Sequence, residues 1–146
     1  MRRAQIFISL ALGLTLSLGS CGEGKAPQGR WEGFSESSEW LLAVRLEVDP
    51  GNVIHATALS VSVDGVSLPR RVELSRKIKR TLAEEWPQAV AGKVDYRDGV
   101  ITKAGGVAPL FSYDPKTRNM TFHFYAGGRL TERIKLYPVQ SFAERG

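Results

Sequence analysis

The chain has 146 residues, the length of one domain, and its 42% apolar and 24% charged residues exclude an intrinsically disordered protein. The net charge of +5 includes Arg2 and Arg3, and the mildly basic remainder does not indicate nucleic-acid binding. The single cysteine, Cys21, excludes an intramolecular disulfide, so apolar burial must stabilise the fold.

Residues 1–20 have the three parts of a secretory signal peptide. Arg2-Arg3 gives a positive start, an apolar run over 6–18 follows, and Gly19-Ser20 supplies small residues before a cleavage site. The apolar run is too short to span a bilayer, which takes about 20 residues. We therefore predict that residues 1–20 are removed during export.

The leader ends in Leu18-Gly19-Ser20-Cys21, which resembles the lipobox of bacterial lipoproteins. This resemblance implies cleavage before Cys21 and a diacylglyceryl group on its thiol, which anchors well because two acyl chains hold where one does not. Gly22 follows, and the resemblance favours the outer membrane because an aspartate there would favour the inner one. The expected protein is exported, membrane-anchored and faces the periplasm. The alternatives are an ordinary signal peptide with a chance cysteine and an uncleaved anchor.

Residues 21–29 are predicted to be the lipidated cysteine and a flexible tether without apolar pattern, and 30–146 to be a single β-rich domain. Gly29-Arg30-Trp31-Glu32-Gly33 resembles the G-x-W start of calycin-type barrels such as lipocalins and avidins. The resemblance implies a β-barrel with one end plugged by Trp31, or at least a core aromatic residue beside a tight turn. A helix in mid-chain departs from lipocalins, where the helix follows the barrel, so no ligand cavity is implied.

Two extended runs form the next predicted unit. From Leu42 to Val48, apolar residues alternate with others at a period of two, which indicates a strand with one buried face. Asp49-Pro50-Gly51-Asn52 favours a turn, and a second extended run covers Val53 to Val63. We expect the two runs to pair as a hairpin.

From Pro69 to Trp86 the apolar spacing becomes helical. The predicted amphipathic helix at about 69–86 has a buried stripe that recurs every four residues: Leu74, Ile78, Leu82 and Trp86. Its other faces carry a basic cluster made of Arg76, Lys77, Lys79 and Arg80. This cluster is either a solvated helix face or a contact with anionic head groups or envelope glycans.

Three turn signals, at Asp98-Gly99, 114–119 and Gly127-Gly128, separate the remaining strands. The predicted strands are 90–97, 100–103, 107–113, 120–125 and 129–137. In the last one, Leu130 is expected to face the core together with Leu136. The predicted fold is mainly β with one inserted helix (α+β), an antiparallel meander that forms a small barrel, closed or partly open.

Few residues indicate catalysis. His55 and His123 lie in predicted strands, and a metal site would need further ligands such as Asp95 or Asp98, for which no spacing motif exists. There is no G-x-S-x-G motif. Gly105-Gly106 could cradle an anion or form a bulged connection. We therefore expect no metal and no cofactor.

We predict a lipid-anchored cell-envelope domain with a binding or structural role and no catalysis. Its expected partners are the membrane, through the lipid on Cys21, and either an envelope protein or a small apolar ligand between sheet and helix. The alternative is a small hydrolytic or metal-dependent enzyme that uses His55 and His123. One pocket holding both histidines would favour the enzyme, whereas histidines on separate faces would remove it.

Overall fold

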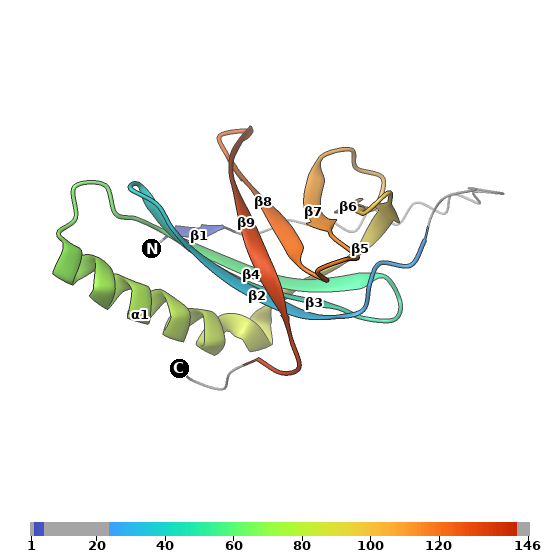
Figure 1. Ribbon diagram of the computed structural model, residues 1–146, viewed down its shortest axis with the longest axis horizontal. Coiled ribbons are helices and arrows are strands. Elements are labelled where there is room, and N and C mark those ends of the chain that lie inside the picture. Colours follow the sequence, from blue (N-terminus) through green and yellow to red (C-terminus); the bar gives the residue numbers. More distant parts are fainter. Residues whose placement is uncertain (1, 5–23, 143–146) are drawn as a thin grey trace.

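The computed structural model describes residues 2–4 and 24–142, which form nine strands, one α-helix and a 3-10 turn (Figure 1). In chain order these are β1 (Arg2–Ala4), β2 (Gly29–Glu36), β3 (Trp40–Val48), β4 (Val53–Ser62), α1 (Leu68–Glu85), η1 (Trp86–Gln88), β5 (Val90–Arg97), β6 (Val100–Lys103), β7 (Pro109–Tyr113), β8 (Met120–Ala126) and β9 (Arg129–Val139). The fold is mainly β with one inserted helix, as predicted. Cys21 and most of the predicted leader lie outside the described residues.

Strands β2 to β9 form an antiparallel barrel of eight strands within the described part of the chain. Two long-range pairings close it. Residues 30–32 of β2 pair with 137–139 of β9, and residues 53–56 of β4 pair with 90–93 of β5, across the inserted helix. Further along the same edge of β4, residues 58–60 pair with β1. The barrel is therefore closed.

Backbone conformation and side-chain bonds explain two of the predicted hairpin turns. Asp98 and Gly99 have φ angles of 51° and 78°, the combination that a tight two-residue hairpin between β5 and β6 requires. Between β3 and β4, the Asp49 carboxylate accepts hydrogen bonds from the backbone N–H groups of Gly51 (2.8 Å) and Val53 (3.1 Å). These bonds, the one from Gly51 above all, lower the pKa of the Asp49 carboxyl. Both predicted hairpins are confirmed.

The barrel interior is the main hydrophobic core, and each of the strands β2 to β9 contributes to it. Inward positions alternate with outward ones, as the pleat of a strand requires. Fully buried members include Leu42, Val44, Leu46, Ile54, Ile101, Phe111, Met120 and Leu136. The rings of Phe111 and Phe122 lie with centroids 5.3 Å apart in this core.

Trp31 lies at the end of the barrel where β2 begins, and it is 3% exposed. Its indole N–H donates a hydrogen bond to the carbonyl of Arg118 at 2.8 Å. Its ring meets Tyr113 edge to face, with centroids 6.3 Å apart. Trp31 is thus a buried aromatic residue at this end of the barrel, an arrangement compatible with a lipocalin-like barrel.

The segment before β2 packs against the same end. Ala26 is 2% exposed, and its N–H donates to the side-chain oxygen of Asn52 at 2.8 Å. The N–H of Gly24 donates to the carbonyl of Tyr96 at 3.3 Å. The described part of the predicted flexible tether, from residue 24 onward, is therefore bound to the barrel. A lone alanine gives no periodicity, so the sequence did not indicate this contact.

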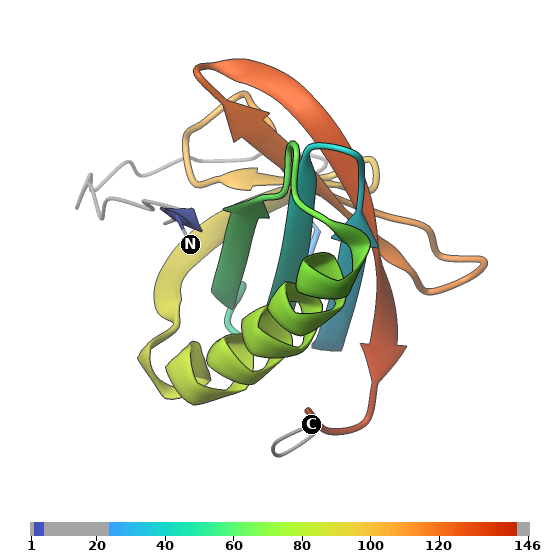
Figure 2. The same cartoon turned by 90° about the vertical axis from the view of Figure 1, so that its left-hand side faces the viewer.

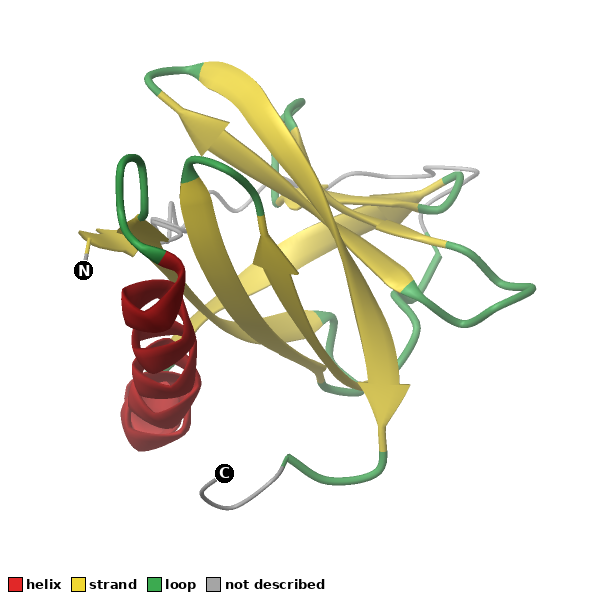
Figure 3. Ribbon diagram, turned by 60° about the vertical axis from the view of Figure 1, so that its left-hand side comes forward, coloured by secondary structure: helices red, strands yellow, loops and turns green. Residues whose placement is uncertain are grey.

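Helix α1 lies outside the barrel, across the outer faces of β3 and β4 (Figures 2 and 3). A second hydrophobic cluster fills the space between them: Leu41, Ala43, Leu59, Val61, Val63, Ile78 and Leu82. Leu74 packs against this cluster at the helix start. Trp86 begins η1, and its ring meets Phe142 with centroids 4.5 Å apart. The predicted helix is confirmed, and the last residue of its stripe packs on the C-terminal segment.

Arg71 joins the start of α1 to the far end of the barrel. Its guanidinium donates to four backbone carbonyls, those of Ser37 (3.2 Å), Ser38 (3.0 Å), Val63 (3.1 Å) and Val66 (3.1 Å). The two serines form the turn between β2 and β3, and the two valines precede the helix. One side chain therefore holds three segments together.

Strand β9 has a register shift beside Phe124 and Tyr125. Phe124 pairs with Glu132, but Tyr125 pairs with Leu130, so one residue of β9 is left out of the pairing. Leu130 consequently turns to the outer face and is 38% exposed. The expectation that Leu130 faces the core with Leu136 is wrong, because a bulge reverses the alternation of a strand.

Candidate functional site: a groove between helix and barrel

The two histidines lie on different sides of the molecule. His55 is on the outer face of β4, where its ring is 3.6 Å from the Asp49 carboxylate. His123 is on β8, and four strand pairings separate β8 from β4 in either direction around the barrel. The described residues contain no group of three or more metal-ligating side chains. The structure therefore does not bring His55 and His123 into one site.

His123 has a different neighbour. Its Nε2 is 2.7 Å from the hydroxyl oxygen of Ser112 on β7, and Arg133 on β9 lies directly opposite it. Burial, and to a lesser degree the charge of Arg133, lower the pKa of His123. A neutral imidazole can accept the Ser112 proton, but no carboxylate of the described residues is hydrogen-bonded to His123 to orient it.

The glycine pair of the β6–β7 connection is engaged with its own chain. The N–H of Gly105 donates to the Asp95 carboxylate at 2.9 Å, and the N–H of Gly106 donates to the carbonyl of Lys103 at 2.7 Å. A register shift between Ile101 and Thr102 accompanies this connection. Of the two interpretations of Gly105-Gly106, the geometry favours the bulged connection.

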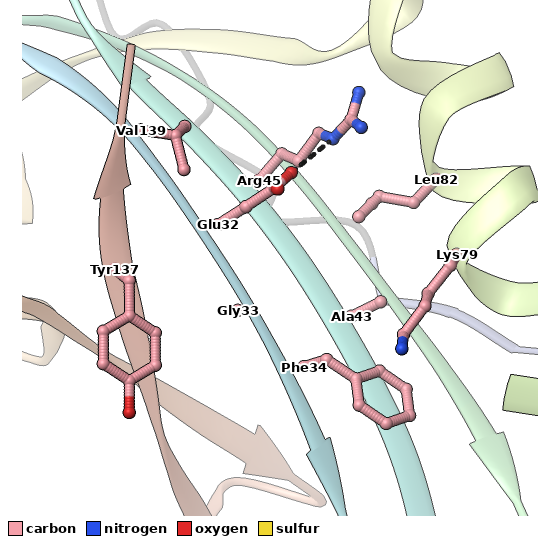
Figure 4. A pocket seen from close by; sticks show the side chains of 9 residues that line it. All are labelled: Glu32, Gly33, Phe34, Ala43, Arg45, Lys79, Leu82, Tyr137 and Val139. Atoms are coloured by element: carbon pink, nitrogen blue, oxygen red, sulfur yellow. Dashed lines mark hydrogen bonds and ion pairs between the residues drawn. The ribbon is translucent and has the colours of Figure 1, made fainter. Parts of the chain in front are cut away.

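A groove of about 490 Å³ lies between α1 and the outer faces of β2, β3 and β9 (Figure 4). Its lining residues are Glu32, Gly33, Phe34, Ala43, Arg45, Lys79, Leu82, Tyr137 and Val139. Most of these contribute apolar surface. The volume is in the range of about 300–1,000 Å³ that small-molecule sites occupy.

Small residues on two neighbouring strands form the floor of the groove. Ala43 on β3 is 1% exposed, and Gly33 on β2 has no side chain. A Cβ atom at Gly33 would overlap the backbone and the side chain of β9, so glycine permits β9 to cross β2 closely. Larger side chains form the walls, with Leu82 on the helix side and Tyr137 and Val139 on β9 (Figure 4). The groove thus exists because a helix and a strand flank a shallow part of the barrel surface.

One end of the groove holds a nearly neutral ion pair. Arg45 points outward from β3, yet its residue is only 6% exposed, because the helix and the C-terminal segment cover it. Its Nε donates to the Glu32 carboxylate at 3.2 Å, and its guanidinium lies 4.9 Å from the centre of the Phe142 ring. A cation this buried requires such partners, so Arg45 and Glu32 largely neutralise each other.

The other end of the groove holds Lys79. Its Nζ lies 4.3 Å from the centre of the Phe34 ring, a cation–π contact between α1 and β2. Among the described residues, no carboxylate forms an ion pair with Lys79. The groove therefore carries one positive charge that no carboxylate of the described residues pairs with, and this charge lies beside an aromatic ring.

The basic cluster predicted from the sequence is divided by the helix geometry. All four members, Arg76, Lys77, Lys79 and Arg80, are exposed. Because successive helical residues are about 100° apart, Lys77 and Lys79 lie on opposite flanks of the buried residue Ile78, and Arg76 and Arg80 point away from the barrel. Lys79 lines the groove, whereas the other three face solvent.

Helix α1 also accounts for the positive charge of the predicted mature chain. It contains six basic and three acidic side chains, whereas the rest of residues 22–146 contains twelve of each. On the flank that carries Lys79, the helix exposes Leu68 (72%) and Val72 (48%). Apolar side chains therefore continue the groove wall toward the helix start.

Comparisons of the chain with protein-family models, with curated proteins and with solved structures give no match. Within the described residues, no helix has both the length and the apolar character that a membrane span needs.

Most of the groove residues were not singled out by the sequence. Phe34 could have been noticed, because it is an apolar residue on the outer face of β2, where Arg30 and Glu32 also lie. Ala43 and Val139 carried none, since an alanine or a valine in a strand is ordinary. Lys79 was identified, but as part of a surface cluster rather than as a groove residue.

Proposed function

We propose that the protein is a binding module of the bacterial cell envelope, anchored through a lipid on Cys21, that holds a small apolar ligand between α1 and the barrel. The observation that carries this proposal is the apolar groove of about 490 Å³. Its walls come from elements far apart in the chain, which the closed barrel holds in place. A preformed concave surface with a few polar groups is the usual form of a small-molecule site.

The predicted leader and its lipobox-like end support the anchor. The basic start, the short apolar run and Leu18-Gly19-Ser20-Cys21 occur in the order that export and lipidation require. Mass spectrometry of the protein from native membranes tests this part, and the expected product starts at a lipidated Cys21 and faces the periplasm. Cleavage elsewhere, or an unmodified thiol, would contradict it.

Two features support binding rather than catalysis. His55 and His123 are on separate faces, so the arrangement expected of the enzyme alternative is missing. In the groove itself, Glu32 is bonded to Arg45 and Lys79 contacts an aromatic ring. An apolar surface with these few polar groups is enough to bind a ligand, whereas catalysis would need reactive groups held close together.

Blocking the groove tests the proposed site. Val139→Trp places a large side chain on one wall, and Arg133→Trp places the same side chain on the outer face of β9, away from the groove. Calorimetric titration with dodecanol, a neutral apolar probe, should show binding to the wild type that Val139→Trp weakens at least tenfold and Arg133→Trp leaves unchanged. Thermal unfolding of both variants checks that the barrel is intact. Equal binding by all three proteins, or none by the wild type, would reject the groove.

A further inference from the structure

The charge distribution in the groove specifies which apolar compounds it takes. The groove is about 490 Å³ in volume, with Glu32 and Arg45 toward one end and Lys79 with Phe34 toward the other (Figure 4). At the first end, the guanidinium of Arg45 is paired with the carboxylate of Glu32 at 3.2 Å. The second has a positive charge without a carboxylate partner among the described residues. A ligand of matching polarity has one negative charge and an apolar body.

We propose that the groove binds the carboxylate form of a long-chain fatty acid, with its head group at Lys79 and its chain on Ala43, Leu82 and Val139. This inference rests on the proposed function, since it names the ligand class of the same site. A single chain suits a groove whose walls are one helix and one strand. The ammonium of Lys79 would exchange part of its contact with Phe34 for a charge-assisted hydrogen bond, which is stronger than a neutral one.

The ion pair at the other end determines the orientation. A carboxylate placed beside Glu32 would be repelled by a like charge, and Arg45 cannot compensate because it is already bonded to Glu32 and covered by Phe142. A head group at the Lys79 end avoids this repulsion. The hydroxyl of Tyr137, a residue that is 56% exposed, offers a further donor at the rim.

Chain-matched ligands separate the head-group contact from the apolar contact. Dodecanoate, dodecanol and dodecyltrimethylammonium would be titrated into the full chain. Binding should be strongest for the carboxylate and weakest for the ammonium. Across octanoate, decanoate and dodecanoate, each added methylene should strengthen binding by up to about fourfold, the effect of burying one methylene.

The decisive variant is Lys79→Gln, and its matched control is Lys77→Gln on the opposite flank of the helix. Lys79→Gln should weaken dodecanoate binding roughly three- to tenfold and leave dodecanol binding unchanged. Lys79→Arg should still bind dodecanoate more strongly than dodecanol. Lys77→Gln should change the binding of neither compound. Equal binding of dodecanoate and dodecanol by the wild type would overturn the fatty-acid inference but would leave the groove as a site for apolar ligands. Equal losses in both glutamine variants would also overturn it, in favour of general surface charge. Failure of all ligands to bind would reject the groove as well.

Discussion

The indole N–H of Trp31 donates a hydrogen bond to the carbonyl of Arg118 at 2.8 Å, across 87 positions of the chain. Arg118 lies in the turn between β7 and β8 and has a φ angle of 63°, in the left-handed region. In this backbone conformation its carbonyl accepts the hydrogen bond of the Trp31 indole. The bond joins the first strand of the barrel to a late turn, and it satisfies the one polar group of a buried side chain.

Trp31→Ala should lower the free energy of unfolding by roughly 3–5 kcal/mol, because it removes a large buried ring from the end of the barrel. Trp31→Phe should lower it by about 1–2 kcal/mol, since the ring remains and the bond to Arg118 is lost. Urea denaturation of residues 22–146 measures both. A loss below about 1 kcal/mol for the alanine variant would show that Trp31 does not close the barrel.

Arg71→Met should cost about 2–3 kcal/mol, since four backbone carbonyls lose a charged donor. Arg71→Lys should recover only part of this loss, because an ammonium cannot reach four carbonyls in two segments at once. The control is Arg70→Met, whose exposed bond to Glu73 should contribute about 0.5 kcal/mol or less. Similar losses at positions 70 and 71 in chemical denaturation would contradict the role assigned to Arg71.

Gly33→Ala should lower the free energy of unfolding of the barrel by roughly 1–3 kcal/mol. The added Cβ would lie 2.5 Å from the Leu136 side chain and would overlap the carbonyl oxygen of Lys135, where backbone cannot yield cheaply. Gly24→Ala is the matched control, because its Cβ would meet only the Tyr96 ring at an ordinary 3.6 Å. If thermal unfolding shifts equally in both variants, the close crossing of β2 and β9 does not depend on glycine.

Stability should fall as the pH drops below about 6.5 because of His123. Burial, followed by the charge of Arg133, lowers the pKa of His123 in the folded state, so the unfolded state binds more protons in this window and is favoured there. His123→Gln should flatten the dependence of the unfolding free energy on pH between about 7.5 and 5.5. An unchanged slope would show that His123 titrates alike in both states.

Lys77→Glu combined with Arg80→Glu should leave stability nearly unchanged, because exposed charges contribute little. If the basic cluster contacts anionic lipid, the double variant of residues 22–146 should bind anionic vesicles more weakly, and salt should weaken wild-type binding. Vesicle sedimentation at low and high salt measures this. The outcome that we expect is no wild-type binding even at low salt, which leaves Arg76, Lys77 and Arg80 as a solvated face.

The fold was predictable where a local pattern dominates. Three elements follow from contacts between residues that are close in the chain. They are the strand indicated by the alternation from Leu42 to Val48, the hairpin turn at Asp98-Gly99, and the helix indicated by the spacing of Leu74, Ile78 and Leu82. Closure of the barrel was not predictable, because the pairing of β4 with β5 depends on where the inserted helix returns the chain. The face of Leu130 was predicted wrongly because one bulged residue in β9 reverses the facing of the strand residues before it, and the sequence does not reveal the bulge.

The candidate site was less predictable than the fold. The groove arises where Lys79 and Leu82 of α1 come near Tyr137 and Val139 of β9, and no spacing in the chain links these two segments. In the sequence, Lys79 is recognisable as a surface charge and Leu82 as a core residue, but only the docking of α1 on the barrel makes both of them line one groove.

The bonds of Gly24 and Ala26 to the barrel constrain how the domain can stand on a membrane. If Cys21 carries the proposed lipid, only Gly22 and Glu23 separate it from Gly24, so the acylated residue is within about 11 Å of a point on the domain itself. The barrel would rest on the end that Trp31 closes, unable to swing far from the bilayer. The turn held by Arg71 would point away from the membrane, and the groove would open sideways along the lipid surface.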